Sequence, residues 1–213
     1  MSLLTDIAAA LERGEDERVG ELVRAALAQS VSPPAILNDG LIAGMDAVGE
    51  RFRQREIFLP DVLLAARAMY AGLEVIQPRL AGAGVPTAGR VVIGTVHGDL
   101  HDIGKNLVGI LLKGAGFEVV DLGSDVPAER FVDAAAEHGA AVIGLSALLT
   151  TTMPVMKDVV GLVRERGLGG RVKVIVGGAP VSEAWAREIG ADAYGYDAAN
   201  AVERVRALVG ARG

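Results

Sequence analysis

Apolar residues recur every three or four positions through the first 80 residues of the chain. This spacing predicts helices that each bury one face. Breaks in the pattern divide the segment into four helices, the third of which begins with Ser32 as a candidate N-cap and Pro33 in the first turn. Four helices with short connections predict a small antiparallel bundle, an N-terminal helical domain over residues 1–84.

The pattern changes after residues 81–89, a stretch of glycine, alanine and proline with the composition of a linker. From there on, short apolar runs alternate with helical segments. Such alternation builds right-handed βαβ units and a parallel sheet with helices on both faces. We therefore expect residues 90–213 to form a Rossmann-like (flavodoxin-like) α/β domain. Its five strands are expected at about 90–96, 117–122, 140–146 and 172–176, and near Ala193-Tyr194.

Composition and charge limit the classes of function. Hydrophobic residues make up 51% and aromatic residues only 4%, which favours aliphatic packing on a parallel sheet. The net charge of −6, without a run of Lys or Arg, argues against a nucleic-acid partner. The absence of cysteine excludes disulfides, thiolate metal sites and cysteine nucleophiles. No secretion signal or membrane-length apolar run is apparent, so we expect a soluble, cytoplasmic protein without a membrane partner.

Candidate chemistry gathers where the first predicted strand ends. Two of the three histidines and two aspartates fall within six residues of this segment. Because strand, loop and helix present polar side chains at the carboxyl end of a parallel sheet, ligands bind there in such folds. The four residues are His97, Asp99, His101 and Asp102.

Three commoner motifs account less well for this segment. It is not a Walker A loop, because five residues separate Gly98 from Gly104 and Asn106 replaces the Ser or Thr that holds magnesium. No G-x-G-x-x-G dinucleotide fingerprint follows the strand. A metal-dependent hydrolase remains an alternative, since imidazole and carboxylate ligate zinc or iron. Such sites draw ligands from later loops, however, and the one remaining histidine, His138, lies on a predicted helix.

Three motifs in order are more specific than any single residue. Asp99-x-His101-x-x-Gly104 is followed by Ser146-x-Leu148 and then by Gly177-Gly178. In this order and at these separations, the motifs resemble the cobalamin-binding domain of methionine synthase and of methanogen-type corrinoid proteins. Taken singly, each would be an ordinary capping or turn residue. The helical half also resembles that family's cap bundle, at Gly44-Met45, Val48-Gly49, Phe58-Leu59-Pro60 and Ala65-Ala66-x-Ala68-Met69.

The resemblance implies a role for each of several residues. His101 would be the lower axial ligand of the cobalt, and Asp99 would accept the other imidazole N–H and fix its tautomer. Thr152 would complete the relay with its hydroxyl, where methionine synthase has serine. Ser146 would border the buried nucleotide tail of the cofactor. The other implied cofactor contacts are Gly98, Leu100, Asp102, Ile103, Gly104, Leu148, Thr150, Gly177, Gly178, Asp197 and Ala198, with Phe58 and Met69 from the cap.

The resemblance also implies a function. With no second catalytic domain apparent, the chain looks like a stand-alone corrinoid protein that binds cobalamin base-off. It would shuttle a methyl group from a substrate-specific methyltransferase to a second one acting on tetrahydrofolate or a thiol, and would need a reductive activation protein. Methanol, methylamine, glycine betaine and aryl methyl ether systems use such carriers, which are not catalytic without their partners. The alternative is a cobalamin-dependent sensor. One departure from the family is Arg55, where relatives often carry glycine.

Overall fold

The computed structural model of the protein describes residues 2–80 and 87–210. Its contacts group the chain into a helical unit, built mainly from residues before the predicted linker, and an α/β unit, built from residues after it. Residues 81–86 of that linker lie outside the described residues. Each unit buries its own set of apolar side chains.

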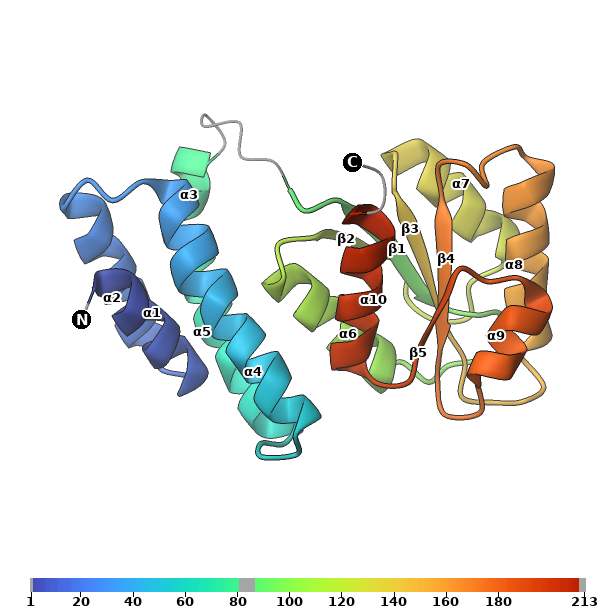
Figure 1. Ribbon diagram of the computed structural model, residues 1–213, viewed down its shortest axis with the longest axis horizontal. Helices are drawn as coiled ribbons and strands as arrows, with labels where there is room; N and C mark the ends of the chain where they lie inside the picture. The colour runs from blue at the N-terminus through green and yellow to red at the C-terminus, as the bar shows by residue number, and fades with distance from the viewer. Residues whose placement is uncertain (1, 81–86, 211–213) are drawn as a thin grey trace. The chain divides into compact units, whose positions relative to one another are not determined.

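The helical unit contains the four predicted helices (Figure 1). Ser2 caps the first by accepting a hydrogen bond from the Thr5 N–H at 3.2 Å. Ser32 caps the third by accepting one from the Ala35 N–H at 3.3 Å, with Pro33 in the first turn as predicted. The helices are α1 (Leu3–Glu12), α2 (Asp16–Ala28), a third helix made of α3 (Pro33–Ala35), η1 (Ile36–Ile42) and α4 (Ala43–Arg53), and α5 (Leu59–Leu80).

Seven residues of the third helix, the segment η1, wind as a π-helix. Two glycines bring this helix close to α1. A Cβ atom on Gly40 would lie 3.2 Å from Ile7 Cγ2, and one on Gly44 would lie 2.9 Å from the Ala8 carbonyl oxygen. The approach therefore depends on residues without side chains. The apolar spacing predicts a helix here but does not distinguish its wider turns.

The third helix ends in a left-handed residue, Arg55, with a φ of 61°. The Glu56 N–H donates to the Arg51 carbonyl, and the Arg55 N–H donates to the Phe52 carbonyl, each at 3.0 Å. These two bonds define a Schellman motif, in which the left-handed position favours glycine. The motif accounts for the glycine expected in relatives, and Arg55 adopts the same conformation at the cost of backbone strain.

The α/β unit is a five-stranded parallel sheet in the order β2-β1-β3-β4-β5, the flavodoxin-like order. Helices α6 and α10 cover one face, and α7, α8 and α9 cover the other (Figure 1). The predicted fold class is confirmed. No helix within residues 2–80 and 87–210 is long and apolar enough to cross a bilayer. The elements are β1 (Arg90–Thr95), α6 (Ile103–Gly114), β2 (Glu118–Asp121), α7 (Ala128–His138), β3 (Val142–Ser146), α8 (Pro154–Glu165), β4 (Lys173–Gly177), α9 (Glu183–Ile189), β5 (Ala193–Gly195) and α10 (Ala198–Gly210).

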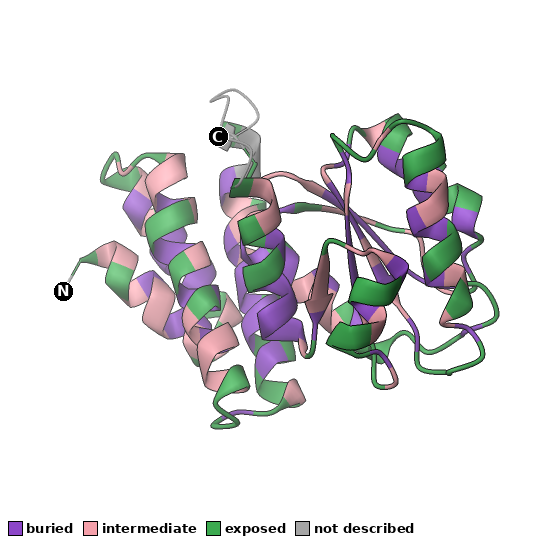
Figure 2. Cartoon of the chain, turned by 45° about the vertical axis from the view of Figure 1, so that its right-hand side comes forward, coloured by how far each residue is buried: buried purple, intermediate pink, exposed green. Residues whose placement is uncertain are grey.

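A large hydrophobic core lies between the sheet and helices α7 and α8. Val92, Ile143 and Val174 lie side by side on three strands. They form one buried cluster with Phe131 of α7 and Met156 of α8, and Figure 2 shows the central strands buried. Full burial of such a side chain is worth about 1.5–3 kcal/mol. This core fixes the strands whose carboxyl ends carry the candidate site.

The opposite face carries only small side chains at its carboxyl end. The strand register aligns Thr95, Ser146, Gly177 and Gly195 in one row across four strands. Side chains of register partners point to the same face, and a Cβ atom on Gly195 would lie 3.0 Å from Ala201 Cβ of α10. The row therefore lies on the face covered by α6 and α10, and its side chains are small or absent.

Candidate functional site

The loop between β1 and α6 is anchored beneath by a buried hydroxyl. The Thr95 side chain is fully buried and donates a hydrogen bond to the His101 carbonyl oxygen at 2.9 Å. The Asp99 N–H turns back to the Val96 carbonyl at 3.1 Å. Sequence reasoning missed Thr95, because its partner is fixed by the path of the loop. Its one sequence signal is a hydroxyl residue in a position that is otherwise part of a buried apolar strand.

The Asp99 side chain, fully buried, is the hub of the site. Its Oδ1 accepts the His101 backbone N–H at 3.0 Å and lies 2.7 Å from His101 Nδ1. Its Oδ2 accepts the backbone N–H groups of Leu148 at 2.7 Å and Leu149 at 3.1 Å. The Thr152 hydroxyl lies 3.1 Å from the same oxygen. The predicted trio of Asp99, His101 and Thr152 is thus brought together, with two backbone donors that the sequence did not reveal.

These contacts decide the charge of Asp99. Burial by itself raises the pKa of the carboxyl group. The hydrogen bonds from the N–H groups of His101, Leu148 and Leu149, and from the His101 ring, outweigh burial and hold the pKa of Asp99 well below its usual value. An ionised Asp99 can only accept, so Nδ1 of His101 carries the hydrogen in this pair. The other ring nitrogen, Nε2, then has a lone pair that can bind a metal.

The Thr152 hydroxyl has two acceptors within reach. Its Oγ1 lies 3.1 Å from Asp99 Oδ2 and 2.9 Å from the Leu149 carbonyl oxygen, and one proton must serve both. The methyl group that Thr152 has and serine lacks faces Gly98, where an added Cβ atom would lie 3.3 Å from Thr152 Cγ2. With a φ of 82°, Gly98 also adopts a conformation that side chains disfavour.

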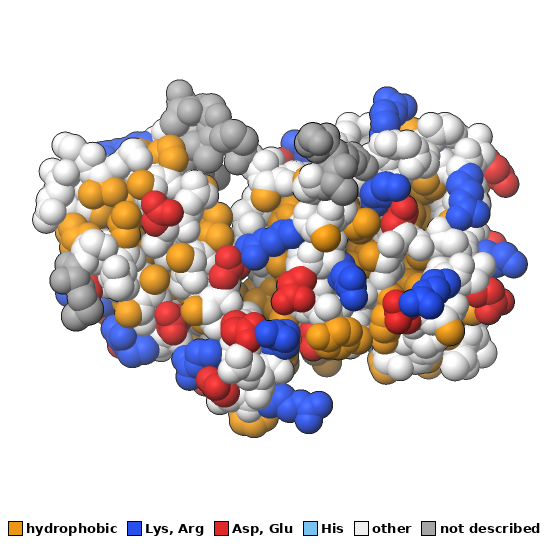
Figure 3. Space-filling model, in the orientation of Figure 1, with side chains coloured by type: hydrophobic (Ala, Val, Ile, Leu, Met, Phe, Trp, Pro, Cys, Tyr) orange, Lys and Arg blue, Asp and Glu red, His pale blue; other side chains and the backbone are white. Residues whose placement is uncertain are grey.

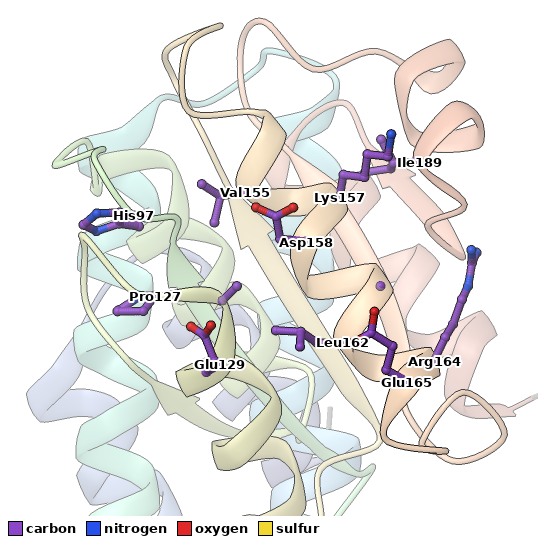
Figure 4. A pocket seen from close by; sticks show the side chains of 12 residues that line it. His97, Pro127, Glu129, Val155, Lys157, Asp158, Leu162, Arg164, Glu165 and Ile189 are labelled. Atoms are coloured by element: carbon purple, nitrogen blue, oxygen red, sulfur yellow. The ribbon is translucent and has the colours of Figure 1, made fainter.

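The other histidine of the loop has a separate carboxylate partner. His97 Nδ1 lies 2.7 Å from Asp125 Oδ1, and both side chains are at least half exposed. Among the described residues, no three His, Asp or Glu side chains are grouped as a metal centre requires. His97 also lines a groove of about 600 Å³ between α7 and α8, whose side chains carry both signs of charge (Figure 4). None of the predicted cofactor contacts lines this groove.

An ion pair between a buried lysine and a partly exposed aspartate lies at the start of α6. Lys105 is almost fully buried, and its Nζ lies 2.6 Å from Asp121 Oδ2 and 2.6 Å from Asn106 Oδ1. Asp102 accepts a bond from Asn106 Nδ2 at 3.0 Å, which ties this predicted cofactor residue to the first turn of the helix. Lys105 lies on α6 and Asp121 ends β2, and the sequence alone did not reveal that they pair.

Exposed apolar side chains lie around the carboxyl ends of the strands. Leu100 is 74% exposed, Ile103 72% and Leu148 44%, while Leu149 and Tyr196 are also exposed. Large apolar groups left in water at one place mark a binding surface. Figure 3 shows acidic and basic side chains interspersed on the face in view. The apolar residues of these loops, rather than charge, therefore distinguish the site from its surroundings.

The remaining predicted residues of the α/β unit differ in how closely the rest of the chain packs around them. Gly178 has a φ of 122°, and an added Cβ atom would lie 1.9 Å from the Ala147 carbonyl oxygen, so this position requires glycine. Around Gly104 the space is open, and Thr150 is exposed. Asp197 caps α10 by accepting the Asn200 N–H at 2.7 Å, followed by the buried Ala198.

The two predicted cap residues differ in exposure. Phe58 is 68% exposed, whereas Met69 is 3% exposed. An exposed Phe58 is free to contact a ligand. A buried Met69 would contact one only after a rearrangement of its surroundings, so its cofactor role stays a prediction. Neighbouring Leu63, Leu64 and Tyr70 are exposed on the same helix as Met69.

A corrinoid fits these features. His101 Nε2 is available as a nitrogen ligand, and exposed leucine and isoleucine side chains suit a large, mainly apolar ring. The row of Thr, Ser and two Gly presents only small side chains on its face of the sheet. Asn200 is 5% exposed, and its Oδ1 has no hydrogen-bond partner among the described residues. A buried oxygen of this kind can accept a bond from an amide-bearing ligand.

Comparisons with known proteins agree with this chemistry. Residues 3–77 and 89–205 each match a family described as a B12 binding domain. A corrinoid protein of Desulfitobacterium hafniense is 42% identical over 213 residues, 99% of each chain. Dimethylamine corrinoid protein 3 of Methanosarcina acetivorans is 45% identical over 207 residues, 97% of each chain.

A solved structure is similar over almost the whole chain. It is the methanol:cobalamin methyltransferase complex MtaBC of Methanosarcina barkeri, which matches with a TM-score of 0.88 and 36% identity. The match covers 98% of this chain and 80% of that one. With a B12 binding domain over more than half its length and corrinoid proteins as relatives, the chain belongs to the corrinoid proteins of methyltransferase systems, and its cofactor is a corrinoid.

Proposed function

We propose that this protein binds cobalamin base-off, with His101 as the residue that would ligate the cobalt through Nε2, and carries methyl groups between two methyltransferases. The observation that carries the proposal is the 2.7 Å contact between His101 Nδ1 and the buried Asp99. Metal-bound histidines commonly donate their other N–H to a carboxylate, which orients the ring. The dimethylamine corrinoid relative and the methanol methyltransferase complex support a role in methylamine or methanol systems.

The residues of the chain have distinct tasks in this mechanism. The bound corrinoid supplies a nucleophilic cobalt that can take up and give up a methyl group. Asp99 holds the proton on His101 Nδ1 and so presents Nε2 with its lone pair. Thr152 and the two backbone N–H groups keep the Asp99 carboxylate ionised.

The test is the EPR spectrum of the Co(II) form of the purified protein loaded with cobalamin. We expect nitrogen hyperfine splitting from a histidine ligand, and we expect His101→Ala to lose it. His97→Ala is the matched control, since it removes the other histidine with a carboxylate partner in the same loop. Splitting that survives His101→Ala would show that another group is the ligand.

The partners follow from the same proposal. A substrate-specific methyltransferase would charge the carrier, a second methyltransferase acting on tetrahydrofolate or a thiol would discharge it, and an activation protein would reduce inactive cobalt. The complex formed by the similar methanol system supports the first of these. Substrate choice would then belong to the first partner, while this chain supplies the cofactor.

A further inference from the structure

We propose that Asp125 is a positioning residue, which holds the β1–α6 loop so that Asp99 and His101 are correctly placed. The inference rests on the proposed function, because it takes His101 as the ligand. Asp125 lies on the loop between β2 and α7, outside the three sequence motifs. Its connections to the β1–α6 loop carry the argument.

Asp125 is bonded to three consecutive residues of that loop. Its Oδ1 accepts the Gly98 N–H at 2.7 Å and lies 2.7 Å from His97 Nδ1. Its own N–H donates to the Asp99 carbonyl oxygen at 3.0 Å. The bond from the Gly98 N–H, the first of several causes, lowers the pKa of Asp125 and favours the carboxylate as acceptor. Asp125 thus holds the backbone on both sides of the turn that leads to Asp99.

The backbone of Asp125 is in a conformation that calls for an explanation. Its φ is 57°, and in the described part of the α/β unit no other residue but glycine has a positive φ. Aspartate tolerates this region better than most residues, although glycine adopts it more readily. Glycine would satisfy the backbone but could not bond Gly98 and His97. The Asp125 side chain therefore supplies a hydrogen-bond acceptor, which glycine lacks, at a position where the backbone is strained.

The other side-chain connections of the loop lie at Asp99 and His101. Thr95 holds the His101 carbonyl from below, and Asp99 bonds the His101 N–H from within the loop. Neither contact holds Gly98, which precedes Asp99 and allows the chain to turn. Without the Asp125 carboxylate, the backbone at 97–99 would keep the bond to the Val96 carbonyl, the bond from the Asp125 N–H and the bridge that pairs Val96 with Val126. We expect wider excursions of Asp99, and of the His101 ring that it orients.

Three substitutions separate the carboxylate from the strain. Asp125→Ala removes the acceptor and keeps the strain, Asp125→Gly removes both, and Asp125→Asn keeps an acceptor oxygen. In cobalamin-loaded protein, we expect the ratio of ligand-off to ligand-on Co(II) to rise about fivefold in the alanine and glycine variants, as loss of one net hydrogen bond implies. The asparagine variant should stay within about twofold of the parent. If the alanine variant does not fold, the glycine variant carries the test.

A second readout needs no cofactor. Amide hydrogen exchange of the His101 N–H should be about fivefold faster in Asp125→Ala and Asp125→Gly apoprotein. Asp192→Ala is the matched control, because Asp192 also accepts one backbone N–H, from Val174 at 2.8 Å, and one side-chain N–H, from Lys173 at 2.9 Å, but away from the loop. The Asp192→Ala variant should be less stable than the parent, but its ratio of ligand-off to ligand-on Co(II) and its His101 exchange rate should be unchanged.

The outcomes distinguish the two proposals. Unchanged ligation and unchanged His101 exchange in both the alanine and glycine variants would overturn the role of Asp125. An equal change in Asp192→Ala would also overturn it, because the effect would then follow general stability. If the parent protein itself shows no nitrogen splitting, the proposed function fails, and the exchange measurement alone decides whether Asp125 holds the loop.

Discussion

At the scale of single residues, the site depends on one buried carboxylate, that of Asp99, which accepts hydrogen bonds from several donors at once. Asp99 is approached by five donor groups, three of them backbone N–H groups. The motif around His101 made Asp99 and His101 predictable, because both lie within three residues of each other. Thr95 and Asp125 were not predictable, since their partners depend on how two loops meet in the folded chain.

The ionised state of Asp99 predicts how stability changes with pH. Its folded pKa lies below the unfolded value, so its contribution is present above about pH 4 and is lost as the pH falls toward the folded pKa. Asp99→Asn should lower the free energy of unfolding at pH 7 by about 2–3 kcal/mol, the worth of a hydrogen-bonded charged group. The deficit relative to the parent should shrink below pH 4.

Urea unfolding followed by the fluorescence of Trp185, the single tryptophan, measures this in the α/β unit. Asp192→Asn serves as a control at a hydrogen-bonded carboxylate away from the site. A deficit of constant size from pH 7 to pH 3 would show that Asp99 is not held ionised by its neighbours.

At the scale of elements, apolar periodicity predicted each helix and strand, while special turns escaped it. The helix beginning at Pro33 and the strand ending at Thr95 followed from spacing and caps. The π-helical turns of η1 did not, because a segment of seven residues is too short for wider turns to show as a distinct apolar pattern. The left-handed Arg55 was visible only as a departure from a glycine expected in relatives. Its physical cause is the Schellman motif at the end of α4.

Arg55 therefore gives a prediction about the helical unit. Arg55→Gly should be more stable than Arg55→Ala by about 1 kcal/mol, because glycine adopts the left-handed conformation without strain. Thermal unfolding followed by circular dichroism compares the two variants. The control pair is Gln54→Gly and Gln54→Ala, one position earlier, where φ is −76° and alanine should be the more stable. Equal stability of the two Arg55 variants would contradict the strain.

At the scale of the whole molecule, the order of a helical unit and an α/β unit was predictable from the change of pattern after residue 80. The likeness to corrinoid proteins spans both units. What the pattern could not supply is the set of contacts that join the loops after β1 and β3, since those contacts cross from one βα unit to another. The site therefore belongs to the assembled sheet rather than to one motif.

The carrier role predicts methyl uptake by the whole protein. Reduced, cobalamin-loaded protein mixed with a methanol or dimethylamine methyltransferase and its substrate should acquire the visible spectrum of methylcobalamin. His101→Ala protein, loaded to the same extent, should be methylated more slowly, because its cofactor is less well held. Loaded protein without a methyltransferase is the control. No methylation with any methanol or methylamine partner would argue against a carrier role in these systems.

The strand order has a consequence for the shape of the site. The connections after β1 and β3 lead to helices on opposite faces of the sheet, and ligands bind beside such a point in folds of this class. Asp99 belongs to one connection, and its Oδ2 is bonded to Leu148 and Leu149 of the other. The Asp99 side chain thus joins the loop after β1 to the loop after β3, and its length sets the distance between them. Asp99→Glu, one methylene longer, should push the two loops apart even if the carboxylate kept all its hydrogen bonds.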